Sequence, residues 1–173
     1  QGSWEWKEWR SHGIGGSDIY ALLGNSPFPD ATPATLWREK TDPTYKRAST
    51  YPMRMGNAWE PIVRKWYEAH TGMECRPICC EHDVESWVHA SLDGWDWRER
   101  ILGEIKCPNA KVHNKALRGV VVEYYLAQVY WQLLTTRAKE CRFVSYYGYG
   151  DKFADALKFV VVPVKANWPI QNR

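Results

Sequence analysis

Residues 101–107 (Ile-Leu-Gly-Glu-Ile-Lys-Cys) constrain the fold of this 173-residue chain more than any other segment. As a β-strand, the segment places Glu104 and Lys106 on one face, because alternate side chains of a strand point the same way. The opposite face carries Ile101, Ile105 and Cys107. Such a strand belongs in a sheet that packs on its apolar side. Its charged side is either a solvated surface or a site for a cation and a water beside a phosphate, and the pattern alone leaves both interpretations open.

The rest of the pattern predicts an α/β fold with a mixed central β-sheet flanked by helices. Helices are expected from Ser17 as N-cap to Gly24, at 34–40 after Thr32-Pro33, at 54–71 (regular from Pro61 onward) and at 122–136. Strands are expected at 76–82, at 84–93 with Gly94 as its end, at 101–107, at 142–147 and at 157–164. The last strand is nearly all apolar, which is typical of a strand covered on both faces.

Composition narrows the class of protein without identifying a function. The length and the 45% hydrophobic residues fit a single domain over residues 1–173, with Gln1-Gly2-Ser3 typical of a cloning remnant. A net charge of +3 permits a nucleic-acid partner, and the eleven Trp and ten Tyr can stack on bases as well as fill a core. With no apolar run long enough for a bilayer and no secretory signal, we expect no membrane association and a cytoplasmic location.

Cysteine usage fits a reducing compartment, because the five Cys residues lack the spacing of a disulfide scaffold. Cys75, Cys79 and Cys80 are close in sequence, but an iron–sulfur cluster needs four thiolates at suitable spacing. Metal ligation by cysteine is therefore a minor alternative, and the sequence leaves the role of this cluster open.

Two acids are expected to meet near Lys106. Asp93 ends one predicted strand and Glu104 lies in the next, so a tight antiparallel turn brings the two carboxylates side by side. Carboxylates at close range repel one another unless a cation neutralises them, and Mg²⁺ or Mn²⁺ suits oxygen ligands. Lys106 can then orient a water or help to deprotonate it. Glu60 is the third acid if its helix packs on this sheet.

Five segments strengthen this interpretation because they occur in a fixed order. They are residues 13–18 (Gly-Ile-Gly-Gly-Ser-Asp), 55–61 (Met-Gly-Asn-Ala-Trp-Glu-Pro), 90–94 (Ala-Ser-Leu-Asp-Gly), 103–108 (Gly-Glu-Ile-Lys-Cys-Pro) and 125–129 (Tyr-Leu-Ala-Gln-Val). Together they resemble the YqaJ-type viral recombinases, which are relatives of phage lambda exonuclease within the PD-(D/E)xK nuclease superfamily. The resemblance spans roughly residues 9 to 147, and it implies a restriction-endonuclease-like core.

The resemblance also implies a role for each matching residue. The metal ligands would be Glu60, Asp93, Glu104 and the backbone carbonyl of Ile105, holding Mg²⁺ or Mn²⁺ with two ions per site. Lys106 would position the attacking water, and Gln128 would contact the active site or the DNA strand. Arg10 and Ser17 match residues that bind the 5′-phosphate in lambda-type enzymes.

The glycine-rich turn before residue 18 supports an anion site on physical grounds, because a helix start offers unpaired N–H groups and a favourable dipole. Asp18 would oppose an anion there, so its side chain is expected to point away. The alternative is that Ser17 only caps a helix.

The chain departs from the family pattern at three places. Leu92 replaces the Pro of the core motif, and Gln132 stands where RecB-like relatives often carry Tyr. The sequence also stops at Arg173, where the family usually continues into a helical segment. The ring-shaped trimer implied by the resemblance is therefore left open.

The activity that the resemblance implies is a divalent-metal-dependent 5′→3′ exonuclease on double-stranded DNA ends. It would leave 3′ single-stranded tails for phage or prophage recombination with a single-strand annealing protein, inside a bacterial host cell. Two alternatives stay open: an endonuclease of the same superfamily, and a DNA-end-binding protein with weak activity.

Overall fold

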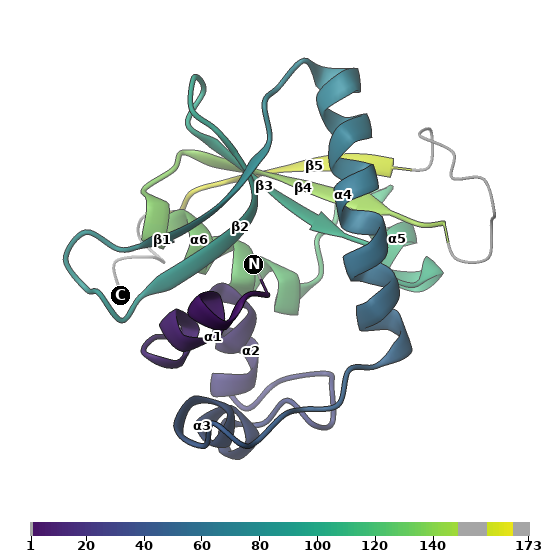
Figure 1. Ribbon diagram of the computed structural model, residues 1–173. Coiled ribbons are helices and arrows are strands. Elements are labelled where there is room, and N and C mark those ends of the chain that lie inside the picture. The colour runs from purple at the N-terminus through teal and green to yellow at the C-terminus, as the bar shows by residue number, and fades with distance from the viewer. Residues whose placement is uncertain (1, 149–158, 168–173) are drawn as a thin grey trace.

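The computed structural model describes residues 2–148 and 159–167, and a mixed β-sheet runs through this part of the chain (Figure 1). Its strands lie in the order β1-β2-β3-β4-β5, and β3 pairs with β4 in parallel while the other neighbours are antiparallel. The strands are β1 (Arg76–Glu81), β2 (His89–Asp96), β3 (Ile101–Lys106), β4 (Glu140–Tyr146) and β5 (Phe159–Lys165). The mixed sheet expected from the sequence is confirmed.

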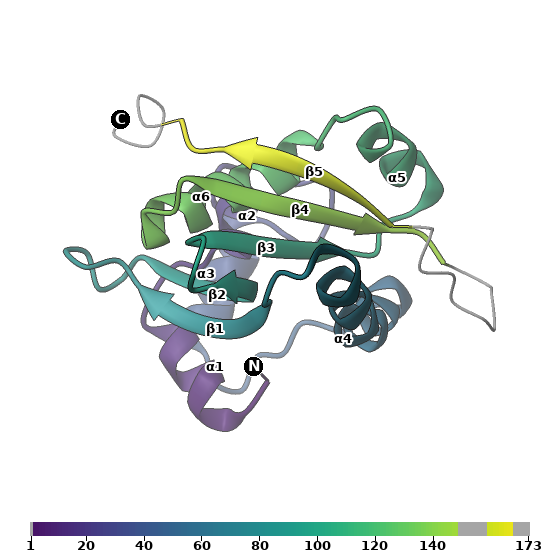
Figure 2. The ribbon, with the colours of Figure 1, turned by 90° about the horizontal axis from the view of Figure 1, so that it is seen from above.

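Helices cover both faces of this sheet (Figure 2). They are α1 (Trp4–Ser11), α2 (Ile19–Leu22), α3 (Pro33–Thr41), α4 (Tyr51–Thr71), α5 (Ala110–Ala116) and α6 (Glu123–Thr136), with a 3₁₀ turn, η1 (Gly16–Asp18), before α2. The parallel pair β3–β4 needs a crossover connection, and α5 and α6 form it. None of the helices in the described residues is both long enough and apolar enough to pass through a membrane.

Strand alternation separates two apolar clusters. One contains Leu102 and Phe143 together with Val129 and Leu133 of α6. The other, across the sheet, contains Ile105 and Val144 together with Val63 and Tyr67 of α4. Because Glu104 is in phase with Leu102, its side chain lies on the α6 face, and the alternation expected for residues 101–107 is confirmed.

The second strand differs from its expected limits of 84–93. It begins at His89 and continues through Gly94 to Asp96, and the chain turns back over residues 97–100. Gly94 is therefore not a strand end. A Cβ at Gly94 would lie 1.7 Å from Cys75 Sγ, so a glycine is needed here because another part of the chain approaches its backbone.

The long helix α4 also differs from expectation. Thr50 caps it by accepting the N–H of Met53, so the helix begins at Tyr51 rather than near residue 54. It continues through Pro61 without ending. Asn57, whose carbonyl loses its helical donor to Pro61, is exposed and open to water, which explains how the proline is tolerated.

Short helices and the last strand account for the remaining differences. Helices α1 and α5 are not signalled by an apolar period, because α1 contains no buried residue and α5 has only seven residues. Strand β5 is an edge strand whose Val162 and Val164 are buried on one face. On the other face Phe159 and Val161 pack against the second cluster but Pro163 and Lys165 are exposed, so the expectation of two covered faces holds only for the first half of the strand. The first two residues of the expected strand 157–164 lie outside the described residues.

The contact between Gly94 and Cys75 gives a test of the fold. Gly94→Ala should lower the free energy of unfolding by about 1–3 kcal/mol, because the new methyl group overlaps Cys75 Sγ. Urea denaturation measures this loss, and Cys75→Ala in the same chain should recover part of it. Gly56→Ala is the matched control: nothing lies within 4 Å of a Cβ there, so helix α4 should gain about 0.5–1 kcal/mol. Equal effects at the two glycines would contradict this close approach of Cys75 to Gly94.

Candidate active site

Asp93 occupies an irregularity between three strands. The β2–β3 ladder pairs Gly94 with Gly103 and ends there, and the β1–β2 register shifts between the pairs Ile78–Leu92 and Arg76–Trp95. Where the next backbone pair would form, Asp93 Oδ2 instead accepts the N–H of Ile105 at 2.8 Å. This bulge turns the Asp93 side chain toward β3, beside Glu104, as expected from the sequence.

Glu104 is 1% exposed and is held by three side chains. Gln128 Nε2 donates to its Oε1 at 2.6 Å, and Gln132 Nε2 donates to its Oε2 at 2.7 Å. Lys106 forms an ion pair with Oε1. Both oxygens of this buried carboxylate are therefore satisfied, and their positions are set by α6 and by β3 itself.

The charges of this group act on one another. Burial raises the pKa of Asp93 well above its usual range, and the nearby charge of Glu104 adds to the effect. Burial opposes the charged form of Lys106, but the attraction of Glu104 and Asp93 outweighs it and raises the pKa of the ammonium group. Lys106 therefore stays protonated beside these acids, and it can donate hydrogen bonds but is a poor base.

Glu60 lies at the edge of this group rather than within it. Its Oε1 pairs with Arg64 Nη2 at 2.5 Å, one turn further along α4. Burial raises the pKa of Glu60, whereas the charges of Arg64 and Lys106 lower it and that of Glu104 raises it, so Glu60 is within electrostatic range of the site. The expected third acid thus approaches from the correct helix, with its carboxylate bound to an arginine.

The side chains of this group supply the oxygen donors that a hard divalent cation prefers, although they do not yet surround a common position for one. Two buried carboxylates side by side, one with a raised pKa, are oxygen donors whose repulsion a cation would relieve. In the described residues no three His, Cys, Asp or Glu side chains already converge as a ligand set. Glu60 would have to exchange Arg64 for a cation to become the third ligand.

Arg10 and Ser17 meet at the glycine-rich turn. Arg10 Nη2 donates to Ser17 Oγ at 3.1 Å and to Asp18 Oδ1 at 2.7 Å. The expected cap is wrong in detail, because Gly15 is the N-cap of η1 and Ser17 lies within the turn. Asp18 is 5% exposed, and its carboxylate also accepts the N–H of Gly15. It therefore occupies donors of the expected anion site, and the expectation that its side chain points away from this site is wrong.

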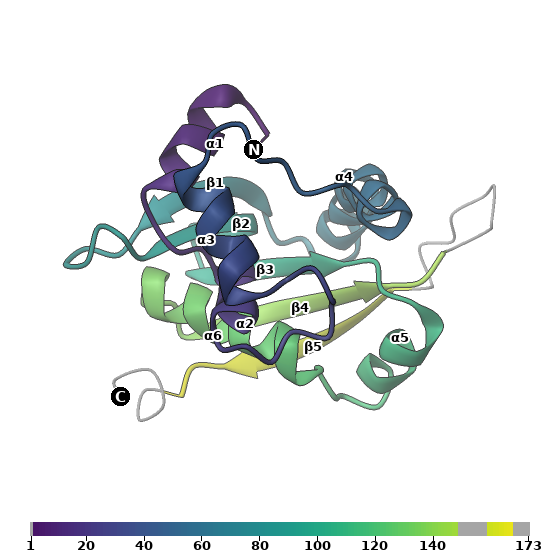
Figure 3. The same ribbon diagram turned by 90° about the horizontal axis from the view of Figure 1, so that it is seen from below.

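This turn lies directly against the residues that hold Glu104. A Cβ added to Gly16 would lie 3.0 Å from the carbonyl oxygen of Gln128 and 3.3 Å from Cγ of Gln132. Seen from below, α2 lies beside α6 on the same side of the sheet (Figure 3). The structure therefore brings the expected phosphate-binding turn and the expected metal site together, with α6 between them.

Two polar side chains go beyond the set expected from the sequence. Gln132 is 1% exposed and, like Gln128, donates a hydrogen bond to Glu104. The sequence could have indicated this role, because residues four apart on a helix lie on the same face. Its Oε1 has no hydrogen-bond partner among the described residues. Lys40 of α3 pairs with Asp18 at 2.8 Å, and nothing in the local sequence signals this contact across 22 positions.

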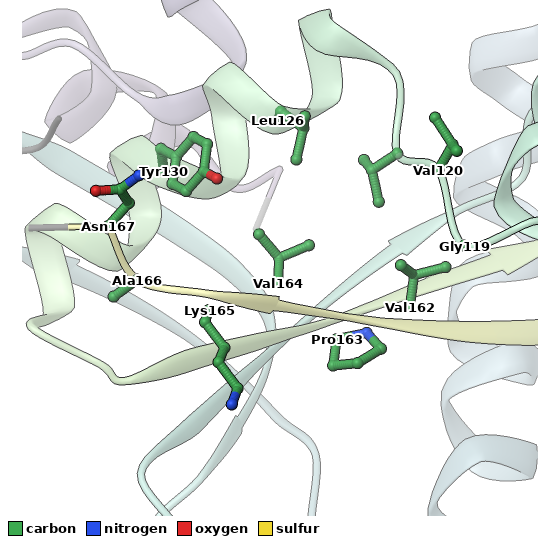
Figure 4. Close-up of a pocket in the computed structure, with 11 residues that line it drawn as sticks. Gly119, Val120, Leu126, Tyr130, Val162, Pro163, Val164, Lys165, Ala166 and Asn167 are labelled. Atoms are coloured by element: carbon green, nitrogen blue, oxygen red, sulfur yellow. The ribbon is translucent and has the colours of Figure 1, made fainter.

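A pocket of about 660 Å³ lies elsewhere, between α6, residues 119–121 and β5. Figure 4 shows Val162 and Val164 pointing into it, while Lys165 and Pro163 lie on the other side of the strand. Its lining contains no acid and no histidine, and none of the site residues expected from the sequence.

Comparisons with known proteins agree with this architecture. A family model described as the YqaJ-like viral recombinase domain matches residues 5–139. The uncharacterized protein YqaJ of Bacillus subtilis (strain 168) is 28% identical over 154 residues, which cover 86% of this chain and 47% of that protein. The chain thus spans about half the length of this curated relative.

Solved structures show the same fold. An alkaline exonuclease (LHK-Exo) from Laribacter hongkongensis matches with a TM-score of 0.78 and 24% identity over 97% of this chain and 84% of that one. A phage-related exonuclease from Haemophilus somnus 129PT matches with a TM-score of 0.68 and 10% identity over 92% of this chain and 87% of that one. The restriction-endonuclease-like fold expected from the sequence is confirmed.

The buried acid pair predicts how stability depends on pH. Because the pKa of Asp93 is higher in the folded chain than in the unfolded chain, the folded state binds this proton more tightly. Without metal, the contribution of Asp93 to stability is therefore greatest at low pH and decreases as pH rises from about 4 through the raised pKa. Asp93→Asn should remove this decrease and raise the free energy of unfolding at pH 8 by roughly 1–2 kcal/mol.

Urea denaturation in EDTA at pH 5 and pH 8 measures this effect. Asp96→Asn is the matched control, because Asp96 is also a buried acid of β2 but accepts the N–H groups of Arg98 and Glu99 in the turn. An unchanged pH dependence in Asp93→Asn would contradict the assignment of the effect to Asp93.

Proposed function

The chain belongs to the YqaJ-like viral recombinase family, and on that premise we propose that it is a divalent-metal-dependent nuclease that degrades the 5′ strand from double-stranded DNA ends. The observation that carries the proposal is the buried Asp93–Glu104 pair with Lys106, placed next to the Arg10–Ser17 turn. A 5′→3′ exonuclease of this kind leaves 3′ single-stranded tails.

Metal binding in this proposal involves Asp93, Glu104 and the backbone carbonyl of Ile105, with Glu60 joining after release from Arg64. The ions would be Mg²⁺ or Mn²⁺, two per site, since both prefer carboxylate and carbonyl oxygens. When bound, they supply an activated water and neutralise negative charge on the phosphate and the leaving oxygen.

The chain's own residues orient the reaction. Gln128 and Gln132 hold both oxygens of Glu104, so this carboxylate has one fixed direction before substrate arrives. Lys106 is a protonated donor, and its proposed role is to orient the attacking water or a phosphate oxygen rather than to remove a proton.

End recognition is proposed for Arg10 and Ser17. A guanidinium and a hydroxyl that already contact one another form a compact donor group for a terminal phosphate. Because η1 packs on α6, a 5′-phosphate bound there lies close to the acid pair, and this arrangement favours cleavage near an end over cleavage within a duplex.

The biological setting in this proposal is recombination of a phage or prophage in the cytoplasm of a bacterial host, with a single-strand annealing protein that coats the product tail. The implied homo-oligomer, a trimeric ring, belongs to the same proposal. These statements rest on the family.

Purified protein tests the activity on a linear duplex that carries one 5′-phosphorylated and one 5′-hydroxyl strand. With Mg²⁺ we expect mononucleotides from the phosphorylated strand, none with EDTA, and survival of closed circular DNA. Glu104→Gln should bind the duplex and release at least about 100-fold less product, since the variant loses an acid of the site.

Two outcomes would overturn the exonuclease proposal. Circular DNA degraded at a similar rate would indicate an endonuclease. Protein that binds ends but cuts no DNA with any divalent metal would indicate an end-binding protein.

Gln132 gives a second test, because it acts on Glu104 rather than on DNA. Gln132→Met keeps the volume but removes the donor, and we expect kcat to decrease about 10- to 100-fold while duplex binding is retained. Thr135→Val is the matched control, since Thr135 is a buried polar residue of α6 that donates to Trp131 O and not to Glu104. Similar kcat losses in both variants would indicate a general packing effect and contradict this role.

A further inference from the structure

We infer that Lys40 is a positioning residue for end recognition: by neutralising Asp18, it leaves the Arg10 guanidinium available for the terminal phosphate. The inference rests on the proposed function, in which Arg10 and Ser17 bind the 5′-phosphate. It deepens that function by assigning a second cation, from α3, that the sequence pattern does not indicate.

The contacts place Asp18 between two cations. Arg10 Nη2 reaches Asp18 Oδ1 at 2.7 Å, and Lys40 Nζ reaches Oδ2 at 2.8 Å. The same Oδ2 accepts the N–H of Gly15 at 2.9 Å. Lys40 also donates to the backbone carbonyl of Arg10 at 2.7 Å, so it contacts both members of the pair.

Burial makes the second cation necessary. The side chain of Asp18 is 7% exposed and that of Lys40 is 15% exposed, so neither charge is well screened by water. A buried carboxylate with one cationic partner binds that partner strongly. Without Lys40, Asp18 would bind Arg10 through both oxygens, and a phosphate would have to compete with this pair.

Arg10 retains donors for a ligand when Lys40 is present. In the described residues its hydrogen bonds to Ser17 and Asp18 are both donated by Nη2, although a guanidinium has five N–H donors. The side chain of Arg10 is 25% exposed, and its guanidinium lies 5.1 Å from the centre of the Trp6 ring. Nε and Nη1 can therefore face a phosphate while Nη2 keeps its protein partners.

Arg47, another cation of this region, does not take the place of Lys40. Its Nε and Nη2 donate to the two carboxylate oxygens of Glu39, each at 2.6 Å. The charge of Arg47 is thus already matched by an acid. Lys40, by contrast, contacts Asp18 directly, alongside Arg10.

The test measures the ratio of cleavage rates on 5′-phosphorylated and 5′-hydroxyl duplex ends under subsaturating conditions. Lys40→Met should reduce this ratio about tenfold through KM for phosphorylated ends, because a charge-assisted contact of Arg10 is lost. Lys40→Arg should retain most of the ratio. Lys46→Met is the control, since it removes the same charge from an exposed lysine nearby.

The double variant D18N/K40M separates positioning from a structural role. With the carboxylate neutral, Arg10 has no charged competitor, and the ratio should return to within about threefold of the wild-type value. This variant also removes the buried carboxylate that Lys40→Met leaves with Arg10 but without its lysine partner, which would threaten folding of the single variant. Thermal unfolding of each variant verifies the fold.

Three outcomes would count against the inference. A wild-type ratio in Lys40→Met means that Lys40 does not position Arg10. A reduced ratio that D18N/K40M does not recover means that Lys40 only ties α3 to α1. Wild-type protein without any preference for 5′-phosphate ends overturns the proposed end recognition itself, which distinguishes that failure from a failure of Lys40.

Discussion

The Asp93–Glu104 pair is the constraint on which the rest of the site depends. Two acids in a dry part of a sheet repel one another and lose hydration, so the fold must supply other partners. Asp93 takes the N–H of Ile105, a hydrogen bond that a regular ladder would give to a backbone carbonyl. Glu104 accepts hydrogen bonds from Gln128 and Gln132 and forms an ion pair with Lys106. The bulge in β2 and the polar face of α6 both follow from this requirement.

The sequence was most informative where periodicity and chemistry coincide. Alternation in residues 101–107 places Glu104 and Lys106 correctly, because the strand is central and one-residue slips would expose its apolar side. The apolar period of 122–136 predicts α6 to within one residue. Periodicity fails for α1, which has no buried residue and is attached through Trp6 and Trp9 hydrogen bonds to Ser91 and Glu81.

Contacts between residues far apart in the sequence explain why other features of the fold and of the site could not be predicted. Gly94 resembles a strand end until Cys75 is placed against it, and that contact exists only in the folded chain. Gln132 differs from the expected pattern and yet binds the same carboxylate as Gln128. Glu60 was placed on the correct helix, and its pairing with Arg64 follows the i, i+4 spacing of acid–base pairs on a helix, although the pair was not among the contacts expected from the sequence. Distant partners of buried charges are thus the least predictable part of the site.

The position of η1 against α6 bears on how a single site could combine cleavage and end recognition. Gly16 approaches Gln128 and Gln132 so closely that a side chain there would push on the residues that orient Glu104. A phosphate bound at Arg10 and Ser17 would pull on the same turn. A push from a side chain at Gly16 and a pull from a bound phosphate would both act through the contact of Gly16 with Gln128 and Gln132. This direct packing contact could couple the phosphate-binding turn to Glu104. Under the proposed function, a DNA end bound at this turn would hold α6 in its cleavage-competent position and so act on the acid pair that cuts the strand, whereas an uninterrupted duplex would not.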